Sequence, residues 1–274
     1  GGAGTAGSAG ASGGHGGASS GGSSAGGASA GGAAGATAGG AGAGGVTISG
    51  PGAIGVGCSQ QPVPASVLAG DYGCDDFDTG NLPQGKSTDQ GWNTQVSTSG
   101  AFLMVFDGLA ASASESLLTS SSSGGTARVS WTPSSASSAP ISHVVLAADV
   151  RPATLQSGVR ILRVDTGMGS VQVFLTSTSS GSVLGLSLTY KGNPVGNDHP
   201  VTGTLPGNTW TRIQLDVDIA AQLVRITIPG QANAPVSGTF DPDSTAQVLV
   251  GPSPFSTQAT FSGYFDDLVA YVVR

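Results

Sequence analysis

Short apolar runs recur through the later part of the chain, and many of them alternate with polar residues. In residues 213–219 the odd positions are Ile, Leu, Val and Ile, while the even positions are Gln and Asp. This alternation predicts a strand with one buried and one solvated face. Gly, Pro, Asn, Asp and Ser separate the runs. The predicted strands are residues 102–106, 127–131, 143–150, 159–164, 171–176, 183–190, 209–219, 223–228, 246–250 and 263–273.

Helical periodicity is weak by comparison, since no segment sustains it for more than about two turns. Residues 109–118 are the best helical candidate, although they are rich in Ser. Many short strands with turn residues between them predict an all-β fold, built as a two-sheet antiparallel sandwich or jelly roll.

The first part of the chain has a different composition. Residues 1–45 contain only Gly, Ala, Ser and Thr apart from His15. Side chains this small cannot bury enough apolar area to offset the backbone entropy lost on folding. We therefore expect residues 1–50 to form a disordered, low-complexity Gly/Ala/Ser tether and residues 51–274 to form one domain.

The charge pattern argues against two classes of partner. Charged residues make up 9% of the chain, its formal net charge is -7, and it has no basic run. Nucleic-acid binding needs clustered positive charge, so we expect no nucleic-acid partner. We also expect no membrane span, because no apolar run reaches about 18 residues.

Cys58 and Cys74 are the two cysteines of the chain, and their spacing does not match a C-x-x-C metal or redox motif. In a Ser- and Thr-rich chain of exported character, such a pair favours one disulfide. Two reduced, buried cysteines are the alternative. The composition and the expected disulfide together predict an extracellular or cell-envelope location, with the protein secreted or tethered.

Three stretches, in this order, resemble parts of one superfamily. They are residues 75–78 with the later Gly91-Trp92, residues 210–218 with the next strand at 223–228, and the last strand at 263–271. Together they resemble the concanavalin A-like lectin/glucanase superfamily, most closely its laminin-G-like members. The resemblance implies a two-sheet antiparallel jelly roll with a carbohydrate ligand. Calcium-binding, galactose-binding-like jelly rolls are the alternative fold.

Glucanases of this superfamily place their carboxylates at a Glu-x-Asp-x-Glu spacing on one strand, where an acid and a nucleophile flank the glycosidic bond. The matching positions here are Gln214, Asp216 and Asp218. An amide cannot act as a general acid, so the pattern favours the polar face of a strand without catalysis. We expect a secreted or surface-anchored, non-catalytic carbohydrate-binding or adhesion module for a polysaccharide or glycoconjugate. The alternatives are a polysaccharide-degrading glycoside hydrolase or lyase, and a purely structural extracellular domain.

Aspartates near both ends of the domain are candidate metal ligands. Asp76 and Asp78 share a strand face if that segment is extended. The resemblance implies that the first and last strands run close together, which would bring Asp267 near them. Carboxylates and backbone carbonyls suit calcium, so we expect a structural calcium ion at these three residues. The alternative is that these aspartates accept hydrogen bonds from turn amides.

Stacking on a sugar ring needs an exposed aromatic side chain with polar neighbours. Trp92 lies in the polar context Gln-Gly-Trp-Asn, and Asn197 and Asp198 lie in a turn-like loop. We expect these three residues to contact carbohydrate, although a tryptophan of a sandwich more often belongs to its core. The other aromatic candidates are Trp131, Trp210 and Tyr190.

Overall fold

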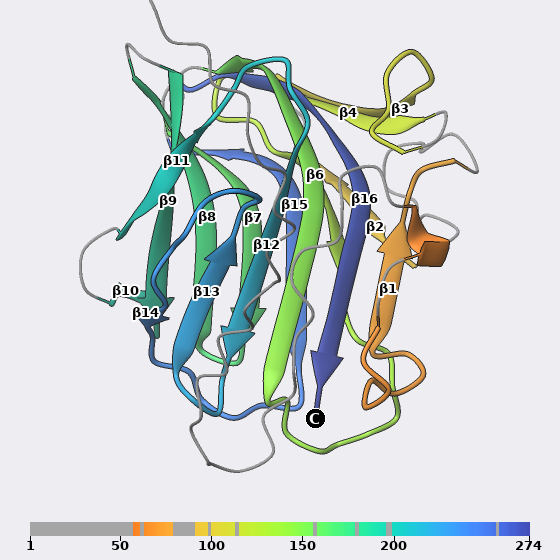
Figure 1. Cartoon of the computed structure of the whole chain (residues 1–274), viewed down its shortest axis with the longest axis vertical. Helices are drawn as coiled ribbons and strands as arrows, with labels where there is room; N and C mark the ends of the chain where they lie inside the picture. The colour runs from red at the N-terminus through yellow and green to blue at the C-terminus, as the bar shows by residue number, and fades with distance from the viewer. Residues whose placement is uncertain are drawn as a thin grey trace, which may run out of the picture. The chain divides into compact units, whose positions relative to one another are not determined.

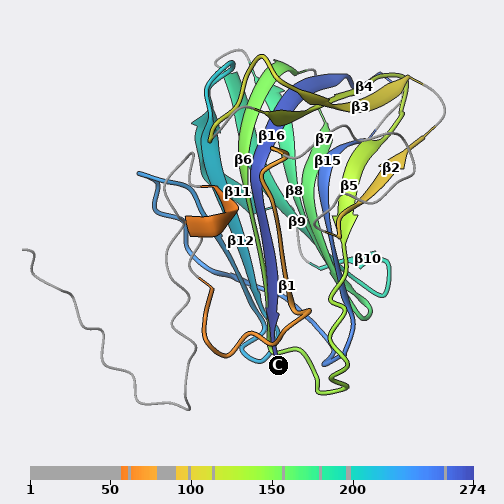
Figure 2. The same cartoon turned by 90° about the vertical axis from the view of Figure 1, so that its right-hand side faces the viewer.

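The computed structural model describes residues 57–274 except 61–62, 79–90, 98–99, 113–114, 156–157, 179–180, 196–198 and 256–257. The tether predicted over residues 1–50 lies outside this part of the chain. The described residues form two antiparallel eight-stranded sheets, here called sheet A and sheet B, which face one another in Figure 2. The predicted two-sheet antiparallel sandwich is therefore confirmed.

Sheet A has the strand order β14-β13-β12-β6-β16-β4-β3, and β1 also pairs with β16 (Figure 1). Its strands are β1 (Tyr72–Asp75), β3 (Ala101–Phe106), β4 (Ser116–Ser121), β6 (His143–Leu155), β12 (Thr211–Asp218), β13 (Leu223–Thr227), β14 (Val236–Ser237) and β16 (Phe261–Val273).

Sheet B has the strand order β10-β9-β8-β7-β15-β5-β2, and β11 also pairs with β9. Its strands are β2 (Asn93–Val96), β5 (Ala127–Trp131), β7 (Val159–Thr166), β8 (Gly169–Thr178), β9 (Gly181–Tyr190), β10 (Asn193–Pro194), β11 (His199–Leu205) and β15 (Ala246–Pro254). A short 3-10 helix, η1, covers Cys58–Gln60.

The main core lies between the two sheets and follows from the alternation of the strands. In β12, Ile213, Leu215 and Val217 are fully buried in this core. The residues between them therefore project from the opposite face of sheet A, which we call the outer face of sheet A.

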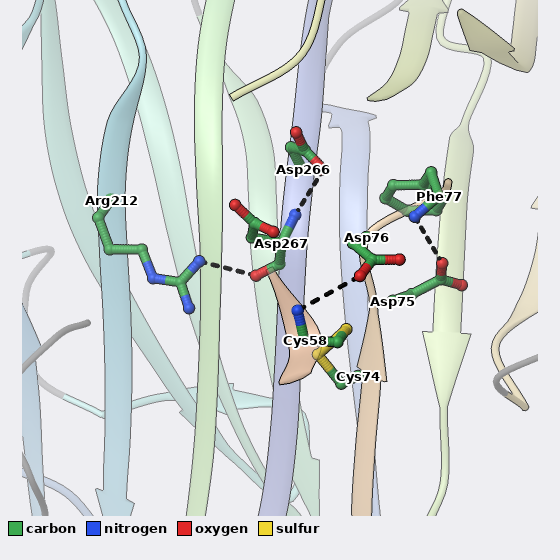
Figure 3. Close-up of a disulfide and its surroundings, with 8 residues drawn as sticks. All are labelled: Cys58, Cys74, Asp75, Asp76, Phe77, Arg212, Asp266 and Asp267. Atoms are coloured by element: carbon green, nitrogen blue, oxygen red, sulfur yellow. Dashed lines mark hydrogen bonds between the residues drawn. A yellow bond between two sulfur atoms is a disulfide. The ribbon is translucent and has the colours of Figure 1, made fainter. Parts of the chain in front are cut away.

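A second, smaller core lies on that outer face. Val145, Ala147, Val269, Tyr271 and other buried residues of sheet A pack there against partly buried side chains from residues 58–72. The disulfide between Cys58 and Cys74 ties η1 to β1 beside this core (Figure 3). The segment before β1 therefore covers part of the outer face of sheet A.

The helix considered for residues 109–118 is wrong, because β4 begins at Ser116 and the described part of the chain contains no α-helix. The helical periodicity of this segment is weak, and the pairing of β4 with β3 and β16 determines its strand conformation. Within the described residues, no helix is long and apolar enough to cross a membrane.

Candidate functional site

The outer face of sheet A gathers polar side chains from three neighbouring strands. The strand register places the outward residues of β12, β6 and β16 in rows across the sheet. The rows are Arg212–Asp149–Asp266, Gln214–Ala147–Val269, Asp216–Val145–Tyr271 and Asp218–His143–Val273. The three positions that resemble the glucanase pattern therefore do share one face, as the sequence predicted.

Arg225 and His143 contact the two aspartates of that pattern. The Nη1 atom of Arg225 lies 3.4 Å from Asp216 Oδ2 and 3.7 Å from Asp218 Oδ2. His143 Nε2 lies 3.2 Å from Asp218 Oδ2, and Asp218 Oδ1 accepts a hydrogen bond from the backbone N–H of Ala221. Arg225 and His143 thus form a polar network with Asp216 and Asp218, and the third position of the pattern is occupied by the amide of Gln214.

Burial changes the proton affinity of two groups in this network. It raises the pKa of Asp216, against the opposing effect of His143 and Arg225. Burial, and then the nearby Asp216, raise the pKa of Tyr271 to about 12. The Tyr271 phenol therefore keeps its proton at neutral pH and is not a ready base.

A buried acidic cluster, formed by Asp149, Asp266 and Asp267, lies next to Arg212 on the same face. All four residues are at most 1% exposed. Figure 3 shows Asp266, Asp267 and Arg212. Arg212 Nη1 donates a 2.7 Å hydrogen bond to the backbone carbonyl of Asp267 and lies 3.4 Å from Asp149 Oδ1. A β-bulge between Asp266 and Val269 adds a residue to β16 here, and Asp267 has a left-handed backbone with φ 47°.

Two carboxyls of the cluster have raised pKa values. Burial raises the pKa of Asp266 to about 6, although the backbone N–H groups of Ala111, Ser112 and Asp267 stabilise its ionised form. Burial, and then the charge of Asp266, raise the pKa of Asp267 to about 7. One arginine faces three acids, so the cluster holds a proton near neutral pH.

The segment that carries Asp76 and Asp78 is not an extended strand. β1 ends at Asp75, and Phe77 has a left-handed backbone with φ 60°. The assumption that the two aspartates share a strand face is therefore wrong. The turn after β1 is stabilised by Asp75, whose Oδ1 accepts a 2.9 Å hydrogen bond from the Phe77 N–H.

Asp76 and Asp78 accept hydrogen bonds from backbone amides, at 3.3 Å from the N–H groups of Cys58 and Glu115 respectively. Asp267 belongs instead to the buried acidic cluster. Among the described residues, no group of three or more His, Cys, Asp or Glu side chains could hold a metal ion. The arrangement favours the amide-binding alternative for Asp76 and Asp78, and the calcium site stays a prediction from sequence.

The residues predicted to contact sugar are not assembled into a site. Trp92 is 0% exposed and packs in the core against Trp131, with ring centroids 6.5 Å apart. The prediction of an exposed Trp92 is therefore wrong, because its polar sequence neighbours are outweighed by the packing of a large apolar ring. Asn197 and Asp198 lie outside the described residues.

The outer face of sheet A carries an aromatic group that sequence reasoning did not assemble. Phe106, Tyr264 and Trp210, here called the aromatic strip, come from β3, β16 and the residue before β12. The ring centroids of Phe106 and Tyr264 are 5.7 Å apart, and those of Trp210 and Tyr264 are 6.5 Å apart. The Arg151 guanidinium lies 5.6 Å from the Tyr264 centroid.

Further apolar side chains extend this strip along β3. Phe102 and Met104 are 44% and 45% exposed, and they share the outward face of β3 with Phe106. A sequence signal for this face exists, because residues 102–106 are apolar at every position. In an edge strand, a run without polar alternation leaves apolar side chains on the solvent side.

Among known proteins, this chain is similar only to solved three-dimensional structures. No family model and no curated protein matches this chain. A sialidase is similar with TM-score 0.50 and 12% identity, over 76% of this chain and 19% of the sialidase chain. A cellulose-induced protein has TM-score 0.47 and 15% identity over 72% of this chain and 95% of its own. A non-specific endo-beta-1,3(4)-glucanase has TM-score 0.49 and 10% identity, over 76% and 94% respectively.

The topology and this likeness define the fold. Two facing antiparallel sheets, with the first and last strands paired as neighbours in sheet A, form a jelly-roll sandwich, and the similarity to the sialidase supports this fold. The fold expected from the three sequence stretches is therefore confirmed. A shared fold does not define an activity, which has to be argued from the site.

Proposed function

We propose that this chain is a non-catalytic carbohydrate-binding or adhesion module, which contacts a polysaccharide or glycoconjugate through the aromatic strip. The observation that carries the proposal is the half-exposed group of Phe106, Tyr264 and Trp210, which lies on one sheet face with Arg151 beside it. Aromatic rings offer an apolar face to the C–H groups of a sugar, and a neighbouring arginine supplies donors to its hydroxyls.

The residues around Asp216 and Asp218, on the same face, support binding without turnover. Hydrolysis of a glycosidic bond needs one carboxylic acid to donate a proton and a second carboxylate as nucleophile or base. Asp216 and Asp218 are engaged by Arg225 and His143, and Gln214 fills the third position. A hydrolase or lyase is the alternative function, and a purely structural domain is the third.

The setting of the module is also part of the proposal. The disulfide between Cys58 and Cys74 favours an oxidising compartment, outside the cell or at the envelope surface. We propose that a flexible tether over residues 1–50 holds the domain away from a surface, where several tethered copies would gain avidity from weak individual sites. Calcium as a structural cofactor remains part of the prediction from sequence.

The test measures binding and turnover on the same material. The purified protein is incubated with a panel of neutral and acidic polysaccharides, and retention is measured by affinity electrophoresis. Trp210→Ala should weaken binding about tenfold or more, as expected for a large aromatic side chain that contacts the ligand. Met168→Ala, which removes another exposed apolar side chain away from the strip, is the matched control and should bind as the parent does.

Each outcome favours one of the three functions. Retention that Trp210→Ala abolishes, without release of reducing ends or unsaturated products, supports the binding module. Product release that Asp216→Ala abolishes would establish the enzyme instead. No retention by any polysaccharide, with or without calcium, would leave the structural domain as the function.

A further inference from the structure

Three arginines converge on the outer face of sheet B, the face turned away from sheet A. Arg128 comes from β5, and Arg160 and Arg163 come from β7. The strand β15 lies between β5 and β7 in the sheet. The three side chains line one small hollow that is open to solvent, and Leu249 and Ser253 of β15 also line it.

The pairing of β15 and β7 is irregular at this hollow. The pairing of β15 with β7 shifts between Val250 and Ser253, and the pairing of β7 with β8 shifts between Arg160 and Leu162. Gly251 lies at the first shift with φ 123°, and a Cβ atom there would lie 2.4 Å from the Ala127 carbonyl oxygen. The missing side chain therefore lets β15 approach the backbone of β5 closely beside Arg128, where any larger residue would collide.

Each guanidinium is held in place by a separate contact. Arg128 Nε donates to Gln95 Oε1 at 3.0 Å, and Arg163 Nε donates to Asp165 Oδ1 at 2.8 Å. The Arg160 guanidinium lies over the Phe255 ring, 4.1 Å from its centroid. The three cationic groups are therefore preorganised.

The hydrogen-bonding capacity of the arginines is only partly used. Within the described part of the chain, the Nη groups of Arg128 and Arg163 have no acceptor, and the buried Arg160 Nε has no partner. These are the donors of the planar fork that recognises carboxylate, sulfate and phosphate oxygens. The donors needed for an oxyanion are thus present.

The charge balance at this place is opposite to that of the whole chain. The chain has nine Lys and Arg residues, a net charge of -7, and three of its arginines at this one hollow. Asp165, which faces them from β7, pairs with Arg163 and compensates one charge. Burial, and then the charge of Arg163, lower the pKa of both Arg128 and Arg160. The arginines repel one another, and an anion between them would remove this repulsion.

We propose that this hollow is an oxyanion-binding site, which takes a sulfate, phosphate or carboxylate group either as a free ion or as part of an acidic glycan. The site lies on sheet B and does not depend on the aromatic strip of sheet A. The ligand oxygens accept hydrogen bonds from the Nη atoms of Arg128 and Arg163, while Arg160 supplies a third positive charge.

Affinity electrophoresis in gels that contain dextran sulfate or neutral dextran tests the proposal with the full chain. We expect retardation by dextran sulfate alone. Arg128→Gln and Arg163→Gln should each weaken it about tenfold, because each removes charge-assisted hydrogen bonds. Lys191→Gln, which removes an exposed positive charge in the turn between β9 and β10, is the matched control and should leave the affinity unchanged. Asp165→Asn should strengthen binding, because it removes the competing carboxylate.

Melting temperature in sodium sulfate, sodium phosphate and sodium chloride at equal ionic strength distinguishes the two sources of the anion. A rise in sulfate or phosphate that Arg128→Gln removes identifies the free ion as a ligand. Retardation by dextran sulfate without this rise identifies the acidic polymer. The proposal is overturned if neither effect occurs, or if the Arg128 and Arg163 variants behave as Lys191→Gln does. Trp210→Ala should keep the retardation, so failure of neutral glycan binding leaves this site unaffected.

Discussion

The buried acidic cluster should make the domain less stable as the pH rises toward neutrality, and Asp267→Asn should remove most of this effect. Asp149, Asp266 and Asp267 are buried together with Arg212 as their cationic neighbour. Asn has nearly the shape of a protonated Asp but cannot ionise. The substitution therefore keeps the packing of the side chain and removes its charge change.

The direction of the change in stability with pH follows from the difference between the folded and the unfolded pKa of each carboxyl group. In the unfolded chain an aspartate has its ordinary pKa of 3.8, whereas the folded pKa is about 6 for Asp266 and about 7 for Asp267. Between these values the folded state binds more protons than the unfolded state, so stability falls as the pH rises. The stabilisation is complete below the unfolded pKa and is lost once the pH passes the folded pKa.

Each unit of difference between the folded and the unfolded pKa corresponds to about 1.36 kcal/mol of unfolding free energy. The difference from 3.8 to about 6 gives about 3 kcal/mol for Asp266, and that from 3.8 to about 7 gives about 4 kcal/mol for Asp267. The two carboxyls interact, so these amounts do not add. We expect the parent protein to lose about 2–4 kcal/mol of unfolding free energy between about pH 4.5 and about pH 8.

Urea unfolding, followed by tryptophan fluorescence at several pH values across this window, measures the slope. Asp267→Asn should have a flatter profile and should be more stable than the parent at the alkaline end. Asp107→Asn, which changes an exposed carboxylate, is the matched control and should keep the parent profile. A parent stability that stays constant or increases with pH would refute the reasoning, as would equal slopes for the parent and Asp267→Asn.

Three further predictions concern packing, the disulfide and calcium. A Cβ atom at Gly73 would lie 2.3 Å from Trp131 Nε1, so Gly73→Ala should destabilise the domain by about 1–3 kcal/mol in urea, whereas Gly207→Ala has open space and should cost less. Reduction of the Cys58–Cys74 disulfide should cost about 3 kcal/mol, and mass spectrometry after alkylation without reductant should detect no free thiol. Millimolar calcium should raise the melting temperature relative to a chelator control, and an unchanged midpoint would contradict the calcium prediction.

The strands could be predicted from sequence because their evidence is local. The alternation of residues 213–219 appears in the structure as a strand with Ile213, Leu215 and Val217 inside and Gln214 and Asp216 on the other face. The exposure of Trp92 could not be predicted in this way. In the core it packs against Trp131 of β5, a contact between residues far apart in the sequence.

The two charged clusters could not be predicted because they depend on register and bulges. Asp149, Arg212 and Asp266 lie on three different strands and become neighbours only when β12 and β16 pair with β6 in the observed register. The arginine hollow likewise needs the irregular pairing of β15, where Gly251 lets that strand approach the backbone at Ala127 and Arg128 closely. Single-sequence patterns contain the residue types but not these pairings.

The position of β16 in sheet A has a consequence for how the chain acquires its fold. This strand is the last along the sequence, yet it pairs with β6 on one side and with β1 and β4 on the other. During vectorial synthesis, a nascent chain that ends before Phe261 has β12 and β6 available but cannot join them to β1 and β4. Assembly of sheet A must therefore wait until β16 has been synthesised, and loss of residues 261–273 would remove a strand from the middle of the sheet.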